Sequence, residues 1–140
     1  MIDIQVKRLT DYAKLPTRAY EHDAGWDLYS AERAYFLPRS SLTISLGIAV
    51  AIPDDHCLLI LDRSGLALAG ITRRAGLIDA GYRGEISVVL VNESNYGTTI
   101  QVGDKIAQMI LLPVPRSCVV EVASLSPAER GKRGFGSSGG

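Results

Sequence analysis

The most constraining feature of this chain is a strict alternation of apolar and small or polar residues. Leu42, Ile44, Leu46, Ile48 and Val50 are separated by single Thr, Ser, Gly and Ala residues. Because successive side chains of an extended strand point to opposite faces, a period of two predicts a strand with one buried face. A chain built on such segments folds by pairing strands, so we expect a β-rich protein.

Residues 2–6 alternate in the same way, and further strand candidates are short, largely apolar segments separated by turns. Strands are predicted at residues 2–6, 57–61, 85–92, 98–102 and 118–122, between turn clusters such as "PDD" and "NESNYG". No long amphipathic helix pattern occurs, and residues 16–30 show no sustained period and are predicted to be loop. Many short strands at close spacing indicate an all-β sandwich or barrel, with a jelly roll among the options.

The length of the chain and its last residues predict the domain organisation. A chain of 140 residues has the size of one domain, and we expect a β domain over residues 1–128. The stretch "RGKRGFGSSGG" at the C-terminus contains one large apolar side chain, Phe135, so residues 129–140 are predicted to form a flexible glycine-rich arm. The arm is either a disordered terminus or a segment that becomes ordered on a bound ligand.

Charge and composition exclude several classes of partner. Fifteen basic residues balance fifteen acidic ones, which argues against a general nucleic-acid binder. No apolar run approaches the roughly 18 residues of a membrane span. The first residues lack the apolar stretch of an export signal, and Cys57 and Cys118, without metal-binding spacing, are predicted to be buried reduced thiols. These features together predict a cytoplasmic protein.

One stretch suggests acid–base chemistry. In "GLIDAGYRGEI", Asp79 has Leu77 and Ile78 before it and Tyr82 after it, so its carboxylate is a candidate for holding and deprotonating a water. The same residues also fit a turn aspartate that caps its own backbone.

Other stretches suggest phosphate and metal binding. In "DRSGLA", Arg63, Ser64 and Gly65 follow a predicted strand and suit phosphate oxygens, although an ordinary turn has the same composition. Gln108 lies in an apolar context, where its amide bonds either to the backbone or to a ligand. Asp27, beside the only Trp, is either a loop carboxylate or part of an oxygen-rich Mg²⁺ site.

The order of these stretches is more specific than any one of them. The sequence closely resembles the trimeric deoxyuridine triphosphatase (dUTPase) family, whose five motifs match "AGWDLYS", "RSGLA", "GLIDAGYRGE", "GDKIAQMIL" and "RGKRGFGSSG". The resemblance implies a jelly-roll subunit and a homotrimer with shared active sites. It also implies Mg²⁺-assisted hydrolysis of dUTP to dUMP and pyrophosphate, which limits uracil incorporation into DNA and supplies dUMP for dTMP synthesis.

The resemblance also implies roles for individual residues. Asp79 is implied as the general base, and Tyr82 as the ring that packs on deoxyribose. Asp27 is implied to contact Mg²⁺ through water. Uracil would be read by the main chain of Gly76, Leu77 and Ile78 and would stack on Phe135. The phosphates would be held by Arg63, Ser64, Gly65 and Gln108. The γ-phosphate would be covered by Arg130, Gly136, Ser137 and Ser138.

Two residues depart from the family pattern. Arg73 stands where many bacterial members carry an Asn that contacts uracil, and Asp62 stands where Pro is common. Two alternative functions are a dCTP deaminase-like enzyme, which shares the fold, and a non-catalytic RNA-binding module that uses the Arg/Gly-rich tail.

Overall fold

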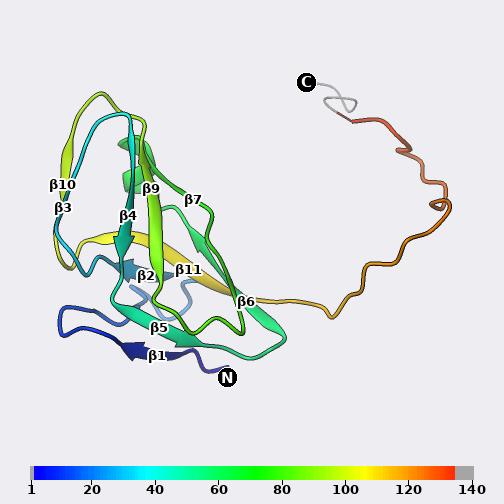
Figure 1. The fold of residues 1–140 in the computed structure, drawn as a ribbon, viewed down its shortest axis with the longest axis horizontal. Helices are drawn as coiled ribbons and strands as arrows, with labels where there is room; N and C mark the ends of the chain where they lie inside the picture. Colours follow the sequence, from blue (N-terminus) through cyan, green and yellow to red (C-terminus); the bar gives the residue numbers. More distant parts are fainter. Residues whose placement is uncertain (1, 135–140) are drawn as a thin grey trace.

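Short strands form almost all of the regular structure (Figure 1). The computed structural model describes residues 2–134. The elements are β1 (Gln5–Arg8), β2 (Trp26–Tyr29), β3 (Ala34–Phe36), β4 (Ser40–Ser45), β5 (Ile48–Ala51), β6 (His56–Leu61), α1 (Ser64–Leu68), β7 (Ile71–Arg74), β8 (Leu77–Asp79), β9 (Ser87–Asn92), β10 (Thr98–Ile100) and β11 (Lys105–Pro113). The all-β prediction is confirmed.

The strands form two main antiparallel sheets around one core. The first sheet has the order β2-β11-β6-β8 and the second has the order β4-β9-β7, while β1 pairs with β5 and β3 with β10. The core takes Leu58 and Met109 from the first sheet and Ile44 and Leu90 from the second. Most neighbouring strands are distant in sequence, as in a jelly roll, which confirms the predicted fold class.

The alternating segment at residues 42–50 is divided between two strands. Strand β4 ends at Ser45 and pairs with β9, whereas β5 begins at Ile48 and pairs with β1. Gly47 between them has φ +63°, and a Cβ there would lie 2.9 Å from the Thr10 Oγ1 atom. The prediction of one continuous strand was therefore wrong, because the chain turns at Gly47 to enter a different sheet.

Some predicted strands are present in the structure, and some observed strands were not predicted. The predictions at residues 57–61, 85–92 and 98–102 are confirmed as β6, β9 and β10. Strand β2 lies inside the region predicted to be loop. Strand β11 shows no alternation, because side chains on both of its faces are buried or half-buried. A strand covered on both faces has a continuous apolar sequence, so period two does not reveal it.

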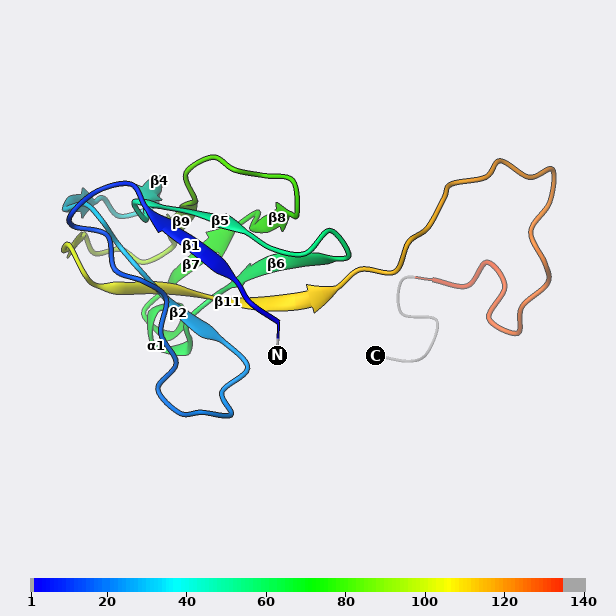
Figure 2. The ribbon, with the colours of Figure 1, turned by 90° about the horizontal axis from the view of Figure 1, so that it is seen from below.

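The chain leaves the body after β11 (Figure 2). Residues 114–134 are exposed, and their first residue is still held by a 2.7 Å hydrogen bond from the Val114 amide to the Asp55 carbonyl. The strand predicted at residues 118–122 is absent, and its valines are exposed because none of the described strands pairs with this segment. Cys118 is also exposed, contrary to prediction, while Cys57 is half-buried. The division of the chain at residue 128 stays a prediction.

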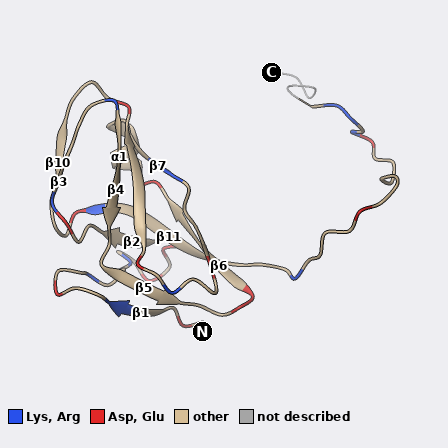
Figure 3. Ribbon diagram, viewed as in Figure 1, with Lys and Arg blue, Asp and Glu red and all other residues tan. Residues whose placement is uncertain are grey.

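Charge is spread over the molecule. Basic and acidic segments are interspersed along the loops and the C-terminal segment (Figure 3). In the described part of the chain, the helical structure consists of the five residues of α1, and no helix there has the length and apolarity needed to cross a membrane.

Candidate active site

One cleft collects cationic and amide donors from three parts of the chain. It has a volume of about 430 Å³ and lies where the loop before β2, the start of α1 and strand β11 meet. We call it the anion cleft; it is lined by Ala19, Asp23, Ala24, Gly25, Asp27, Arg63, Ser64, Lys105 and Gln108. Four residues predicted to bind phosphate or metal, Asp27, Arg63, Ser64 and Gln108, therefore lie together.

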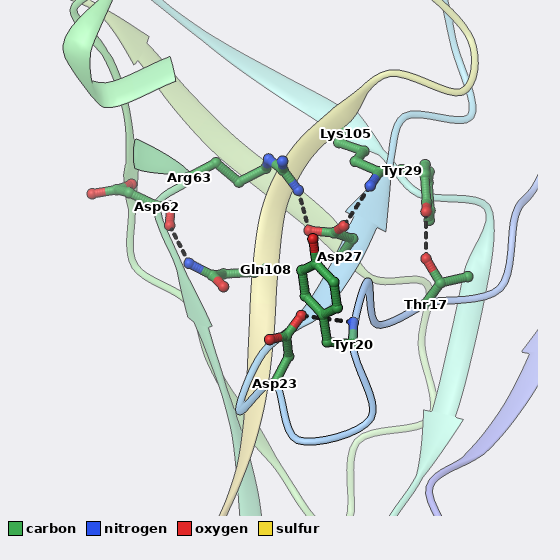
Figure 4. A network of polar contacts seen from close by, with 9 residues as sticks. All are labelled: Thr17, Tyr20, Asp23, Asp27, Tyr29, Asp62, Arg63, Lys105 and Gln108. Carbon is green, nitrogen blue, oxygen red and sulfur yellow. Dashed lines mark hydrogen bonds and ion pairs between the residues drawn. The ribbon is translucent and has the colours of Figure 1, made fainter. Parts of the chain in front are cut away.

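The centre of this cleft is a carboxylate held between two cations (Figure 4). Arg63 donates to the Oδ1 atom of Asp27, and the Lys105 Nζ atom lies 2.7 Å from Oδ2. The hydrogen bond with Asp27 raises the pKa of Lys105 above its usual value. Both cations are thus held at the cleft before any ligand enters, and a polyphosphate would compete with Asp27 for them.

Gln108 is fixed by the backbone. Its Nε2 atom donates to the Asp62 carbonyl at 2.8 Å, as the backbone interpretation of the sequence predicted. On the other side, a Cβ at Gly25 would lie 2.3 Å from Gln108 Oε1, so the absence of a side chain at Gly25 lets the two strands bring this amide into the cleft. Because a glutamine amide carries two N–H bonds, one remains for a ligand.

A second cleft holds the candidate base. It has a volume of about 350 Å³, and we call it the Asp79 cleft; it is lined by Leu77, Ile78, Asp79, Tyr82, Glu85, Ile86 and Ser87. Asp79 is the last residue of β8 and is exposed, and its carbonyl accepts a 3.0 Å hydrogen bond from the Tyr82 amide. The Tyr82 hydroxyl donates to the Glu85 carbonyl at 2.9 Å. Within residues 2–134 the Asp79 carboxylate has no hydrogen-bond partner, so it does not cap its own turn.

Strand β8 also presents its main chain. It pairs with β6 on one side only and forms the edge of the first sheet. The main-chain donors and acceptors of an edge strand that face away from the sheet are open to a ligand. Leu77 is 63% exposed, so this edge is accessible in the subunit.

The remaining candidates lie elsewhere. Gly65 follows Ser64 in the first turn of α1, and Gly76 directly precedes β8. Arg130 lies on the exposed C-terminal segment, where its Nε atom donates to the Arg133 carbonyl at 3.0 Å. Phe135, Gly136, Ser137 and Ser138 lie outside the described residues.

Sequence reasoning missed five of the nine residues that line the anion cleft: Ala19, Asp23, Ala24, Gly25 and Lys105. The motif "GDKIAQMI" contains Lys105, but the partner that fixes it lies 78 positions earlier and is visible only after the strands pair. Gly25 belongs to the motif "AGWDLYS", and its role depends on a side chain of another strand. These residues carry no local pattern that would reveal them.

The donors suit Mg²⁺ only in part. Residues 2–134 contain no group of three or more His, Cys, Asp or Glu side chains arranged for a metal. Asp27 and Asp23 are the carboxylates of the anion cleft, and Asp27 is engaged by two cations. This set fits an ion that keeps several waters and takes its other ligands from substrate phosphates, which is the usual mode of Mg²⁺.

A jelly-roll subunit with an anion cleft and a carboxylate–tyrosine cleft has the parts of a nucleotide-hydrolysing enzyme. Comparison with known proteins identifies which family of such enzymes it is. The model of the dUTPase family matches residues 11–139, and the chain belongs to this family.

Relatives and solved structures agree with this assignment. The chain is 42% identical over 139 residues to the deoxyuridine 5'-triphosphate nucleotidohydrolase of Clostridium tetani, covering 97% of this chain and 96% of the relative. It is 47% identical over 128 residues to that of Tropheryma whipplei, with 89% and 88% covered. These matches do not support the deaminase or the RNA-binding alternative.

Solved structures of dUTPases from Staphylococcus phages are similar to this chain. A variant of the bacteriophage 80alpha dUTPase with dUpNHpp has a TM-score of 0.92 and 30% identity, with 98% of each chain covered. A variant of the phage phi11 dUTPase, described with a structural Mg(II) ion, has a TM-score of 0.84 and 26% identity, with 89% of this chain and 99% of that chain covered.

Proposed function

We propose that this protein hydrolyses dUTP to dUMP and pyrophosphate as a homotrimer, with each active site completed by residues of neighbouring subunits. The observation that carries the proposal is the division of the candidate residues into two clefts. The anion cleft contains the cations and amides suited to phosphates, and the Asp79 cleft contains the candidate base and the edge strand suited to a nucleobase. A nucleotide needs both sets at once, so we infer that one copy supplies the first and another copy supplies the second.

The edge of β8 is suited to uracil. Uracil presents an N–H donor between two carbonyl acceptors, which complements alternating main-chain groups of an extended strand. Cytosine carries an acceptor where uracil has the N–H donor, and an amino donor where uracil has one of its carbonyl acceptors. On the same strand edge, this acceptor would face a carbonyl and this donor would face an N–H, so these main-chain groups would stay unpaired. Contact of the Tyr82 ring with the deoxyribose would leave no room for a 2′-hydroxyl.

Asp79 is assigned as the general base. Its exposed carboxylate is free to accept a proton from a water that attacks the α-phosphorus, and the bond to the bridging oxygen of pyrophosphate then breaks. Arg63, the Ser64 hydroxyl, the Gly65 amide and the second N–H of Gln108 would hold the phosphate oxygens. The amides of the first turn of a helix have no carbonyl partner within it, which leaves those of α1 available. Bound Mg²⁺, contacted by Asp27 through water, would supply charge neutralisation of the phosphates.

The C-terminal segment supports the assembly. Residues 114–134 expose Val119, Val120, Val122 and Leu125, and none of these side chains belongs to the core formed by residues 2–134. Exposed apolar side chains in such a contiguous segment are typical of an interaction surface, and we assign another copy of the chain as the partner. Beyond this segment, Arg130, Phe135, Gly136, Ser137 and Ser138 would close over the bound nucleotide.

The reaction is tested by pyrophosphate release with Mg²⁺ from dUTP, dCTP, dTTP and UTP at equal concentrations. Release from dUTP alone would support the reaction together with selectivity for base and sugar. Ammonia release from dCTP would indicate the deaminase instead, and loss of RNA binding on deletion of the tail would indicate the RNA-binding module.

The shared site is tested by mixing two inactive variants. Asp79→Asn removes the base from one cleft, and Arg63→Ala removes a cation from the other. If each site takes the two residues from different copies, random mixed trimers prepared from equal amounts should regain activity at about a quarter of their sites. If both residues act from the same copy, mixing restores nothing, and the assembly proposed here is wrong.

A further inference from the structure

Arg73 and Asp62 form a pair outside the lining of both clefts, next in sequence to Arg63 of the anion cleft and shortly before Leu77 of the Asp79 cleft. The Arg73 main-chain amide, on β7, donates to the Asp62 Oδ1 atom at 2.7 Å. The guanidinium Nη1 atom donates to the Ala75 carbonyl at 2.6 Å, while Nε lies 3.9 Å from Asp62 Oδ1. Within residues 2–134, Nε is a buried side-chain nitrogen without a hydrogen-bond partner. The guanidinium thus has one firm hydrogen bond and one carboxylate near it.

Asp62 lies beside the anion cleft without lining it. It directly precedes Arg63, and its carbonyl accepts the hydrogen bond from Gln108. Its carboxylate bonds to the Arg73 amide, so its negative charge lies one residue away from donors assigned to phosphates. The Arg73 guanidinium is the cation nearest to that charge among the described ion pairs. Without it, Asp62 would repel a polyphosphate.

Ala75 belongs to the turn that leads into the base-reading strand. It has φ 59°, a left-handed conformation that is unfavourable for a residue with a side chain, and Gly76 after it has φ 117°. Gly76 also approaches β6 closely: a Cβ there would lie 3.0 Å from the Ile60 carbonyl oxygen, and the Ile60 amide donates to the Gly76 carbonyl at 2.8 Å. The hydrogen bond from Arg73 to the Ala75 carbonyl holds this unfavourable turn.

We propose that Arg73 is a positioning residue for the reaction. Its guanidinium holds the turn at Ala75 and Gly76 so that β8 presents its edge to the base, and it offsets the charge of Asp62 at the anion cleft. The inference rests on the function proposed above. It gives a physical reason for the joint presence of an arginine and an aspartate at these positions.

The two parts of this role are separable by mutation. Arg73→Met keeps the length of the side chain and removes both interactions. We expect the KM for dUTP to rise about tenfold, the size that loss of one hydrogen bond to a charged group produces. The kcat should change far less, because Asp79 is held through its pairing with Cys57 on β6. The preference for dUTP over dCTP should fall, because the edge of β8 is no longer fixed.

Asp62→Asn isolates the electrostatic part. Asparagine keeps an acceptor for the Arg73 amide and removes the charge. In the double variant with Arg73→Met, the KM for dUTP should return most of the way to the parent value, while the reduced preference for dUTP over dCTP should persist. Arg73→Lys keeps a cation near Asp62 without the guanidinium fork, so it should lower the preference with a smaller change in KM.

Arg74→Met is the matched control. Arg74 is the exposed neighbour on the same strand, and within residues 2–134 it makes no side-chain hydrogen bond or ion pair. Circular dichroism and the oligomer mass verify that each variant is folded. If the Arg73 variants have the KM and base preference of the Arg74 variant in an otherwise active enzyme, the positioning role is refuted. If the unmodified chain itself releases no pyrophosphate from dUTP, the proposed function is refuted first and this role with it.

Discussion

The close approach of Gly25 to Gln108 gives a sharp test of the anion cleft. Gly25→Ala would place a methyl group 2.3 Å from Oε1 and 3.2 Å from Cδ of Gln108. Both distances are well inside van der Waals contact, so one of the two groups has to move. The flexible Gln108 side chain moves more easily than the paired strands, and it would lose its 2.8 Å hydrogen bond to the Asp62 carbonyl.

The size of the effect follows from that lost contact. Removal of one intramolecular hydrogen bond costs about 1 kcal/mol of folding stability. In a chain of this length such a loss lowers the Tm by about 3–4 °C. Displacing the amide from the cleft also removes a phosphate donor, so the KM for dUTP should rise about fivefold to tenfold while Asp79 and kcat are little affected.

A double-mutant cycle identifies the cause. Both Tm and KM are measured for Gly25→Ala, Gln108→Ala and the double variant. When Gln108 is already truncated to its Cβ, the added methyl group at Gly25 lies next to open space left by the amide, so the second mutation should add little. Equal costs of Gly25→Ala in both backgrounds would refute the reasoning, because the clash would then lie with the backbone rather than with Gln108.

Three further predictions concern the base, the C-terminal segment and the ion pair. The Asp79→Asn variant should still bind dUTP in calorimetry. Its kcat should be lower by a factor of about 10² to 10⁴, which is the usual contribution of a positioned base. Full activity of this variant would exclude Asp79 as the base. Truncation after Glu129 should abolish turnover without changing the circular dichroism spectrum, since residues 114–134 are exposed and do not contribute to the core; turnover at the full rate would refute closure by the arm. The raised pKa of Lys105 means that its pairing with Asp27 stabilises the fold. This stabilisation is fully present when the pH lies below the usual lysine pKa of 10.5, and it is lost as the pH rises through the raised pKa of Lys105. In urea denaturation, Lys105→Met should therefore be less stable than the parent at neutral pH, and the difference should vanish at high pH; a difference independent of pH would contradict the ion pair.

Local patterns were sufficient for much of the fold. Short apolar runs between turn clusters identified β6, β9 and β10. Alternation did not reveal β11, which is largely covered on both faces, or the break at Gly47, where the apolar pattern continues through a change of sheet. At residues 118–122 the pattern of a strand is present and the strand is not, because a strand needs a neighbour that the single subunit does not provide.

Residue types and their order were also sufficient for the family. The five motifs identified the class of enzyme and several of the residues that line each cleft, since the chemistry of phosphates and of a general base requires particular side chains. The role assigned to Asp79 and the closing role of the arm stay predictions.

Only the tertiary structure decided how those residues meet. Arg63 reaches Asp27 across 36 positions of sequence, and Gln108 reaches the Asp62 carbonyl across 46. Such contacts depend on which strands become neighbours, and no local pattern records that choice. The same pairing gives the anion cleft and the Asp79 cleft different lining residues in one subunit, and the trimer proposed above would bring the two sets together.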